Sequence, residues 1–243
     1  MNPWDDLSDA FAQSRQVSAD KLIEWPAQLR MAGDFQGRRV LDIGCGSGDK
    51  TRYFAEHGAA AVIGIDSSKG FAAGWSASHN HVPNLRLLHA DFEKLKTIPE
   101  LLEKPFDLIV SFQAIMYARD LATTLRDAAA LLAPSGVFVL SVPHPFRFAV
   151  LRNEIEGWGH GFAYQRTEPY RYPSPWKPEV LLEHSMPRMS DYINAITTAG
   201  LSIVGCEEPA PTEDLRQLAP EKAKWMDRYV GTVIFRCEKN DLV

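Results

Sequence analysis

Five short apolar runs alternate with longer amphipathic segments in the first 142 residues, and this alternation restricts the fold more than any other feature. The runs are RRVLDI (38–43), AAVIGID (60–66), NLRLLHA (84–90), FDLIVSF (106–112) and GVFVLSV (136–142). They are continuously apolar, as strands are when helices cover both faces of their sheet. The series therefore predicts an α/β fold with a doubly wound, mostly parallel sheet.

The segments between these runs fit helices. They are DKTRYFAEHG (49–58), SSKGFAAGWSASHN (67–80) and RDLATTLRDAAALLAPSG (119–136), the last closed by Pro134 and Gly136. A further helix at about 189–199 precedes two later strands, LSIVGCEE (201–208) and VGTVIFRCE (230–238).

The composition argues against several classes of function. The chain has 243 residues and a net charge of −5, which gives no support to binding a nucleic-acid backbone. The acidic N-terminus, MNPWDDLSDAFAQ, is not typical of a signal peptide, and no apolar run is long enough to span a bilayer. Three dispersed cysteines without a C-x-x-C pair indicate neither a disulfide framework nor a zinc site. These features predict a cytoplasmic protein without a membrane segment.

A glycine-rich turn follows the first strand and marks the expected ligand site. Gly44, Gly46 and Gly48 come directly after Asp42 and Ile43. A dinucleotide-binding turn needs G-x-G-x-x-G, but Asp49 stands at the place of the last glycine. A carboxylate about 5 Å from a phosphate costs about 3 kcal/mol at an effective dielectric near 20, so Asp42 disfavours a pyrophosphate. The same charge favours a ligand with an ammonium group and a sulfonium.

The segment VLDIGCGSGDKTRYFAEHGAAAVIGIDSS resembles the first motif and second strand of the class I S-adenosylmethionine-dependent methyltransferases. Later motifs match in order: HADFEKL (89–95), FDLIVSFQAIMY (106–117) and LLAPSGVFVLSV (131–142). The resemblance covers roughly residues 38–142. It implies a seven-stranded, Rossmann-like sheet and the transfer of a methyl group from S-adenosylmethionine, which leaves S-adenosylhomocysteine.

The resemblance also implies roles for single residues. Gly44 and Gly46 would let the methionine part of the cofactor approach the backbone, and Asp42 would orient its ammonium group. Asp66 would accept both ribose hydroxyls. The remaining expected contacts are Asp91 to the adenine amino group, Phe92 beside the ring, and Ser67 and Ser111 nearby. The alternative for Asp66 and Asp91 is that each caps the helix that follows it. Cys45 is expected to be a small residue in a tight turn and not a nucleophile.

Two segments flank this core in the expected single methyltransferase domain. Residues 1–35 would form a helical lid that brings Trp4, Phe11 and Trp25 near the site, with Arg15 pairing with the methionine carboxylate. The alternative is an amphipathic helix whose aromatic residues lie in the core. The cofactor-binding core would span 36–142, and the C-terminal helix and strands 189–243.

Residues 143–188 form the least typical part of the chain and the expected substrate cap. This insert holds eight aromatic residues: Phe146, Phe148, Trp158, Phe162, Tyr164, Tyr170, Tyr172 and Trp176. Its prolines and glycines argue against a long regular helix. A loop-rich aromatic cap over the cleft suits an apolar or planar acceptor. A small additional core or a dimer contact is the alternative.

His144 is the candidate for direct chemistry, because it follows the fifth strand at the edge where the acceptor should lie. Methyl transfer depends on alignment, but an acceptor hydroxyl or acidic carbon also needs a base. The alternative is a histidine held by backbone hydrogen bonds between two prolines. His160 and His184 are lesser candidates. The absence of an H-E-x-x-H pattern and of a carboxylate cluster indicates no metal.

The sequence therefore predicts methylation of an oxygen, nitrogen or carbon atom of a small, apolar or aromatic molecule by a monomer or homodimer. RNA or protein methylation and a cofactor-binding module without turnover stay open as alternatives. A nicotinamide-dependent oxidoreductase is disfavoured by Asp42 and by the missing glycine.

Overall fold

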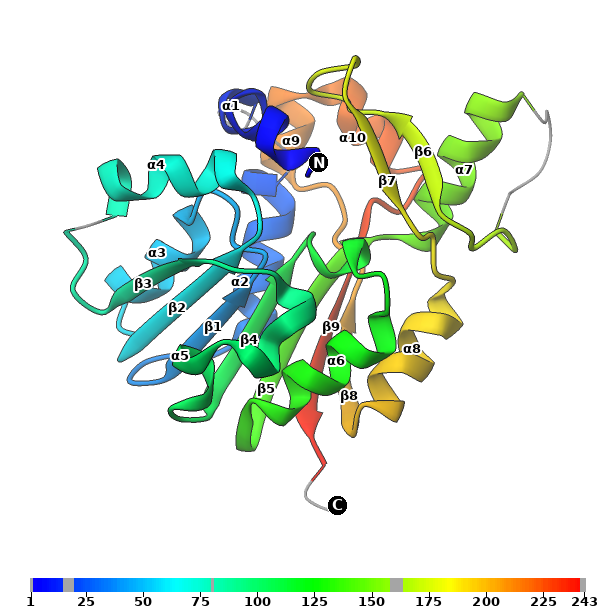
Figure 1. Ribbon diagram of the computed structural model, residues 1–243. Helices are drawn as coiled ribbons and strands as arrows, with labels where there is room; N and C mark the ends of the chain where they lie inside the picture. The colour runs from blue at the N-terminus through cyan, green and yellow to red at the C-terminus, as the bar shows by residue number, and fades with distance from the viewer. Residues whose placement is uncertain (1, 15–19, 80, 158–163, 241–243) are drawn as a thin grey trace.

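A seven-stranded sheet forms the centre of the protein (Figure 1). The computed structural model describes residues 2–14, 20–79, 81–157 and 164–240. The strand order is β3-β2-β1-β4-β5-β9-β8. β9 runs antiparallel to both of its neighbours, β5 and β8, and the pairs from β3 to β5 in this order are parallel. The strands are β1 (Arg39–Ile43), β2 (Ala61–Asp66), β3 (Leu85–His89), β4 (Phe106–Phe112), β5 (Leu132–Pro143), β8 (Leu201–Glu207) and β9 (Thr232–Lys239). The expected doubly wound, seven-stranded, mostly parallel fold is confirmed.

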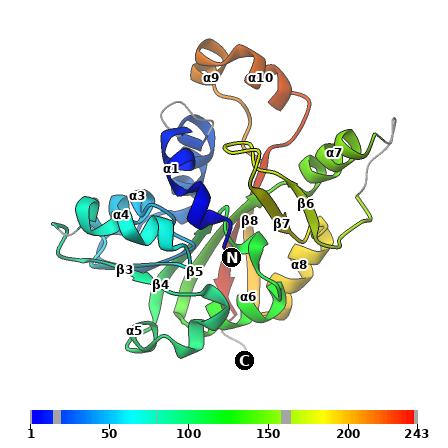
Figure 2. The ribbon, with the colours of Figure 1, turned by 45° about the horizontal axis from the view of Figure 1, so that its top comes forward.

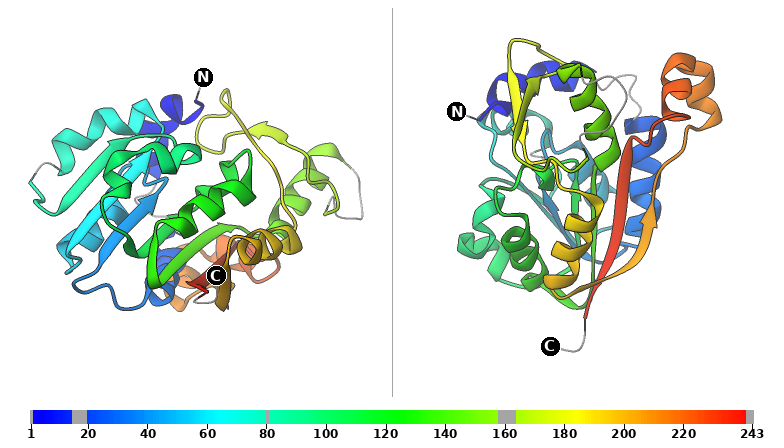
Figure 3. Two further views of the ribbon diagram at one scale, coloured as in Figure 1. Left: turned by 60° about the horizontal axis from the view of Figure 1, so that its bottom comes forward. Right: turned by 90° about the vertical axis from the view of Figure 1, so that its right-hand side faces the viewer.

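Helices cover both faces of this sheet, as the right panel of Figure 3 shows with the sheet seen edge-on. The α-helices before the insert are α1 (Trp4–Ser14), α2 (Trp25–Ala32), α3 (Asp49–Glu56), α4 (Lys69–His79), α5 (Pro99–Leu102) and α6 (Leu121–Ala130). Those after β5 are α7 (Pro145–Glu156), α8 (Met189–Thr198), α9 (Glu213–Leu218) and α10 (Pro220–Met226). Short turns of other helix types are η2 (Asp20–Glu24), η3 (Phe92–Thr97) and η4 (Ile115–Tyr117).

The two faces carry separate cores, which explains the continuous apolar runs. Leu41 and Ile109 pack on one face with Leu125 of α6. Val40 packs on the other face with Phe54 of α3. Successive residues of a strand point to opposite faces, so a strand that is covered twice needs apolar side chains throughout.

The insert is more regular than the sequence indicates. α7 occupies its first part, and an antiparallel hairpin of β6 (Tyr170–Pro173) and β7 (Leu181–His184) follows. The expectation that prolines and glycines prevent a regular helix is wrong for 145–156. Pro145 lies in the first turn of α7 and Gly157 ends it with a φ of 66°, so both residues act as helix boundary signals.

The helix expected over 119–136 is shorter than predicted. It ends at Ala130, because the Leu131 carbonyl accepts a hydrogen bond from the Phe106 amide and β5 begins at Leu132. Pro134 and Gly136 therefore lie within β5, where the register with β4 shifts between Phe106 and Leu108.

Four segments gather beyond the carboxyl ends of the parallel strands: α1, α7, the β6–β7 hairpin and the α9–α10 pair (Figures 1 and 2). α1 packs against α4, and α9 contacts η2. The α9–α10 pair between β8 and β9 has no counterpart in the sequence prediction. Ligands of open α/β sheets bind at this edge.

Candidate active site

The glycine turn after β1 has a backbone that requires glycine. Gly44, Gly46 and Gly48 have φ values of 76°, 56° and 82°. A Cβ added to Gly44 would lie 2.2 Å from the Cβ of Ala114, in the loop after β4. The amides of Gly44 and Cys45 both donate to the Ile65 carbonyl of β2, at 2.9 and 3.0 Å. The turn is therefore held between the ends of β2 and β4.

Asp66 joins the end of β2 to this turn. Its Oδ2 accepts a hydrogen bond from the Gly46 amide at 2.9 Å, and its Oδ1 accepts one from the Ser68 amide at 2.8 Å. Burial raises the pKa of Asp66, although these backbone hydrogen bonds oppose the shift. The helix cap that the alternative interpretation assigned to Asp66 is instead supplied by Ser68, whose hydroxyl accepts from the Phe71 amide of α4 at 3.3 Å. The Asp66 carboxylate lines the cavity described below.

Asp42 is the second acid beneath the turn. It is buried at the end of β1, and its Oδ2 accepts a hydrogen bond from the Thr51 hydroxyl of α3 at 2.7 Å. This bond ties α3 to β1 directly below the glycines. Burial, together with the charges of Asp42 and Asp66, raises the pKa of the neighbouring Cys45 thiol, which keeps that thiol protonated and a poor nucleophile.

Asp91, Phe92 and Ser67 form the next part of the rim. Asp91 caps η3, with its Oδ1 accepting from the Glu93 amide at 2.9 Å. The Ser67 hydroxyl accepts a hydrogen bond from the Asn2 side-chain amide at 3.2 Å, which links the rim to the N-terminal segment. All three residues line the cavity.

One cavity of about 1140 Å³ connects the glycine turn with the cap. It brings together seven of the predicted cofactor residues: Asp42, Gly44, Gly46, Asp66, Ser67, Asp91 and Phe92. Arg15 falls outside the described residues, as do His160, Trp158 and Phe162.

Ser111 and His144 lie away from the described lining of this cavity. Ser111 is fully buried in β4, and its hydroxyl donates to the Ile43 carbonyl at 3.0 Å. It therefore ties β4 to β1, and its predicted contact with the cofactor has no support in this placement.

His144 is the N-cap of α7. Its Nδ1 accepts from the Phe146 amide at 3.2 Å, and its Nε2 lies 2.9 Å from Oε1 of Glu208. Burial lowers the pKa of His144, although Glu208 opposes the shift. Both ring nitrogens are engaged, so the structure places His144 as a structural cap, and its predicted role as a base gains no geometric support.

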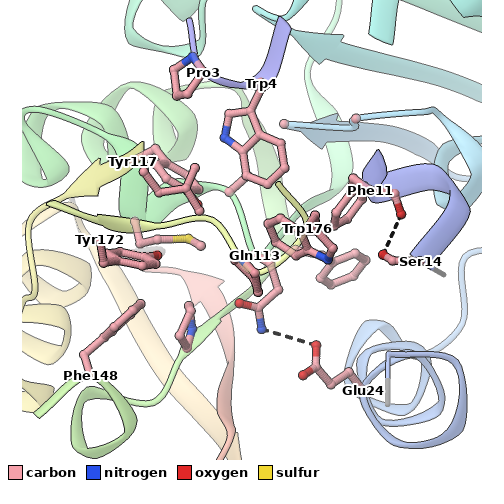
Figure 4. A pocket seen from close by; sticks show the side chains of 18 of the residues that line it. Pro3, Trp4, Phe11, Ser14, Glu24, Gln113, Tyr117, Phe148, Tyr172 and Trp176 are labelled. Atoms are coloured by element: carbon pink, nitrogen blue, oxygen red, sulfur yellow. Dashed lines mark hydrogen bonds between the residues drawn. The ribbon is translucent and has the colours of Figure 1, made fainter. Parts of the chain in front are cut away.

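The N-terminal helix closes one side of the cavity. Trp4 and Phe11 of α1 line it, and both rings contact Trp176 of the cap, with centroids 5.5 and 4.9 Å apart (Figure 4). Trp4 also packs edge-on against Tyr117 at 5.7 Å. The N-terminal lid and the cap thus meet over the cavity, about 170 residues apart in the chain. Trp25, by contrast, packs in the core against Phe54 and Phe112.

The cap contributes part of its aromatic set to the cavity. Phe148, Tyr172 and Trp176 line it. Phe146 is 49% exposed and stacks on Tyr164, and Tyr170 packs against the guanidinium of Arg152. The cap is therefore both a cavity wall and a small packing unit.

Gln113 is a lining residue that sequence reasoning missed. It follows β4 with a φ of 59°, and its Nε2 donates to the Thr232 hydroxyl at 3.1 Å and to Glu24 at 3.4 Å (Figure 4). These bonds fix the side-chain amide with its nitrogen toward Glu24. A non-glycine residue with positive φ at the end of a strand often marks a functional position.

Other missed lining residues come from distant elements. Tyr117 lies in the motif after the fourth strand, where its place at the ligand edge of the sheet was the available signal. Leu215, Lys222 and Trp225 belong to α9 and α10, which no local motif connects to the site. In the described ranges, no group of three or more histidine, cysteine, aspartate or glutamate side chains is arranged to hold a metal.

Comparison with known proteins identifies a family. A family model described as a methyltransferase domain matches residues 15–203, which is more than half of the chain. An S-adenosylmethionine-dependent methyltransferase from Mesorhizobium loti is 26% identical and superposes with a TM-score of 0.67, over 89% of this chain and 97% of that one. A Listeria monocytogenes protein has the same fold, with a TM-score of 0.77 at 23% identity over 90% of this chain and 97% of that one.

Curated relatives have different substrates in their names. The chain is 32% identical over 134 residues to a trans-aconitate 2-methyltransferase from Delftia acidovorans, which is 55% of this chain and 46% of that protein. It is 36% identical over 119 residues to a tRNA U34 carboxymethyltransferase from Pseudoalteromonas translucida, 48% of this chain and 35% of that protein. The match thus spans less than two thirds of the length of either relative. No helix within the described ranges is long and apolar enough to cross a membrane.

Proposed function

The chain belongs to the class I S-adenosylmethionine-dependent methyltransferases, and on that premise we propose that it methylates an oxygen, nitrogen or carbon atom of a small, apolar or aromatic molecule. The observation that carries this proposal is the single cavity that joins the acidic glycine turn to an aromatic cap. Its turn side has the groups that S-adenosylmethionine needs. Its cap side has apolar and aromatic side chains, which suit a small organic acceptor.

The residues of the turn fit the cofactor by their hydrogen-bonding capacity. Each oxygen of Asp66 accepts one backbone N–H, and a carboxylate has about four acceptor positions in all. One further position on each oxygen is thus available for a ribose hydroxyl. A charged hydrogen bond of this kind contributes about 1.5–3 kcal/mol.

Other rim residues complete the proposed cofactor contacts. The negative charge of Asp42 lies below the glycines and favours an ammonium group above them. Phe92 supplies an aromatic face beside Asp91, whose second carboxylate oxygen would accept from the adenine amino group. S-adenosylmethionine, when bound, supplies a methyl group activated by the sulfonium.

The protein's contribution to the transfer is alignment and exclusion of water. An in-line displacement gains most from holding the two reactants in the correct geometry. Trp4, Phe11 and Trp176 close the cavity by direct ring contacts, and such closure keeps water from the reacting atoms. The apolar walls then select a planar or apolar acceptor.

A tRNA substrate is the second candidate, because the chain resembles curated proteins named tRNA U34 carboxymethyltransferase. The net charge of −5 counts against it, since phosphate contacts supply most of the affinity for nucleic acids. A cytoplasmic location, a monomeric or homodimeric state and the absence of a metal requirement stay predictions.

The test is to follow labelled methyl groups. The pure protein is incubated with methyl-labelled S-adenosylmethionine and a cell extract that has been divided into small-molecule, RNA and protein fractions. We expect label in the small-molecule fraction. Label in RNA or protein would overturn the proposed acceptor class, and no transfer to any fraction would favour a binding module without turnover.

A further inference from the structure

Tyr172 and His184 form a hydrogen-bonded pair at the cap side of the cavity. The Tyr172 hydroxyl lies 3.0 Å from Nε2 of His184. Tyr172 lines the cavity, where Figure 4 shows it below Tyr117, whereas His184 is buried in β7. The pair therefore connects the cavity to a buried imidazole.

The hydrogen-bond partners fix the position of each proton in this pair. Nδ1 of His184 lies 2.7 Å from the Ser185 carbonyl, which can only accept, so Nδ1 carries the proton. In the neutral imidazole Nε2 is then an acceptor, and the Tyr172 hydroxyl donates to it. The lone pairs of the Tyr172 oxygen are then the acceptor that the pair offers to a ligand in the cavity.

The surroundings keep both groups neutral. Burial lowers the pKa of His184, although its bond to the Ser185 carbonyl opposes the shift. Burial raises the pKa of Tyr172 to about 12, and the charge of Arg147 of α7 partly offsets this shift. Tyr117 packs edge-on against the His184 ring at 5.2 Å, and burial raises the pKa of Tyr117 well above its usual value. Phe148 packs on the same ring at 4.5 Å.

We propose that Tyr172 and His184 are a proton relay that removes the proton from the nucleophilic atom of the methyl acceptor. The inference rests on the proposed methyl transfer and deepens it. An acceptor hydroxyl or protonated amine donates to the Tyr172 oxygen, and Tyr172 passes its own proton to Nε2 of His184. Tyr172 is the catalytic residue that touches the acceptor, and His184 acts through it.

The reaction balances without another reactant. The bond from the acceptor atom to its proton breaks, and that electron pair forms the new bond to the methyl carbon. The carbon–sulfur bond breaks with its electron pair left on sulfur, so the positive charge of the sulfonium is replaced by that of the His184 imidazolium. The reverse proton path through Tyr172 returns the proton to solvent after the product leaves.

The relay narrows the acceptor class. It serves an acceptor whose reacting atom carries a proton that must be removed, such as a phenol, an alcohol or an ammonium group. A substrate that is already an anion or a neutral tertiary amine gains nothing from it. The structure thus favours a hydroxyl or amine acceptor within the small-molecule class.

The first arm of the test is Tyr172→Phe, with Tyr170→Phe as the matched control. Both changes remove one hydroxyl from β6, and Tyr170 lies outside the described cavity lining. General-base catalysis contributes about 10²–10⁴-fold, so Tyr172→Phe should slow label transfer to the small-molecule fraction at least about tenfold near neutral pH. The loss should shrink at alkaline pH, where more of the acceptor is ionised. The affinity for S-adenosylhomocysteine should not change in either variant.

A rate for Tyr172→Phe equal to that of the wild type, or a loss independent of pH, would overturn the relay and leave the proposed function intact. A wild-type protein that labels only RNA or protein would overturn the proposed acceptor class instead. The second arm needs no acceptor. Nitrogen NMR of labelled histidine, assigned with His184→Gln, should show His184 neutral and protonated on Nδ1 at neutral pH. Protonation on Nε2, or a charged ring, would overturn the relay whatever the substrate.

Discussion

The methyl group of Ala114 occupies the space that a side chain at Gly44 would need, with only 2.2 Å between the two Cβ positions. This contact fixes the distance between the glycine turn and the loop after β4, the two segments that flank the cofactor side of the cavity. Position 44 therefore requires glycine for two reasons: its positive φ, and the steric contact that any side chain would make with Ala114.

Gly44→Ala should therefore destabilise the protein more than the same change at Gly37. Both glycines have positive φ, 76° and 69°, but Gly37 has no heavy atom within 4 Å of an added Cβ. The left-handed conformation costs roughly 1–2 kcal/mol at either position, and overpacking against Ala114 adds about 1–3 kcal/mol. Urea unfolding measures both values. The double variant Gly44→Ala with Ala114→Gly should regain most of the difference, and equal losses for Gly44→Ala and Gly37→Ala would contradict the steric account.

Trp176→Ala should speed the dissociation of S-adenosylhomocysteine. The ring of Trp176 contacts Trp4 and Phe11 across the cavity, and each such pair contributes about 0.5–1.5 kcal/mol, equivalent to about a two- to tenfold change in rate. Stopped-flow fluorescence measures the dissociation rate constant. Phe146→Ala removes an exposed cap aromatic outside the described cavity lining and should leave the rate unchanged. Equal rates in the wild type and Trp176→Ala would show that the lid does not retain the ligand.

His144→Ala should lower stability and leave cofactor affinity unchanged. The substitution removes the N-cap of α7, which typically costs about 0.5–2 kcal/mol, and ends the contact with Glu208. His144→Asn retains a capping side chain and should recover part of the loss. Urea unfolding and calorimetric titration of S-adenosylhomocysteine measure the two properties. A variant that keeps its stability but loses methyl transfer would instead support the base role expected from the sequence.

The free energy of unfolding should fall as the solution is acidified below about pH 6.5, the ordinary histidine pKa. Burial lowers the folded-state pKa of His144 and His184, so the unfolded chain binds protons more readily in this range. Their contribution to stability is present above the unfolded pKa and is lost as the pH falls through the folded pKa. His184→Gln should show a smaller decrease than the wild type in paired urea titrations. Parallel curves for the two proteins would refute this assignment.

The strands were predictable because their burial leaves a strong local pattern. β4 has the bounds read from the sequence, 106–112, since both of its faces are covered and every residue in its centre is apolar. The secondary structure of the insert was harder to predict, because Pro145 and Gly157 are each compatible with two structures. Proline and glycine disrupt the interior of a helix but are favoured at its ends, and only the packing of neighbouring segments decides between these roles.

Some residues of the site were predictable from the sequence and others were not. Asp66 and Gly46 lie within one continuous motif, so the sequence alone brings them to one turn. Tyr172 and Tyr117 come from segments 55 residues apart, and no local pattern in the sequence shows that the β6–β7 hairpin packs against the η4 turn that follows β4. His144 shows the converse: its position after β5 is correct for a base, but its ring contacts Glu208 beyond β8.

The most direct test of the account is calorimetric titration of S-adenosylmethionine into the wild type, Asp66→Ala and Asp34→Ala. Asp34 and Asp66 each accept a hydrogen bond from the amide two residues later, but Asp34 is exposed and outside the described cavity lining. We expect one site per chain in the wild type and in Asp34→Ala. In Asp66→Ala the affinity should be at least about tenfold weaker, because losing both ribose bonds costs more than about 1.4 kcal/mol. Unchanged affinity in Asp66→Ala, or no binding by the wild type, would contradict the placement of the cofactor against the glycine turn.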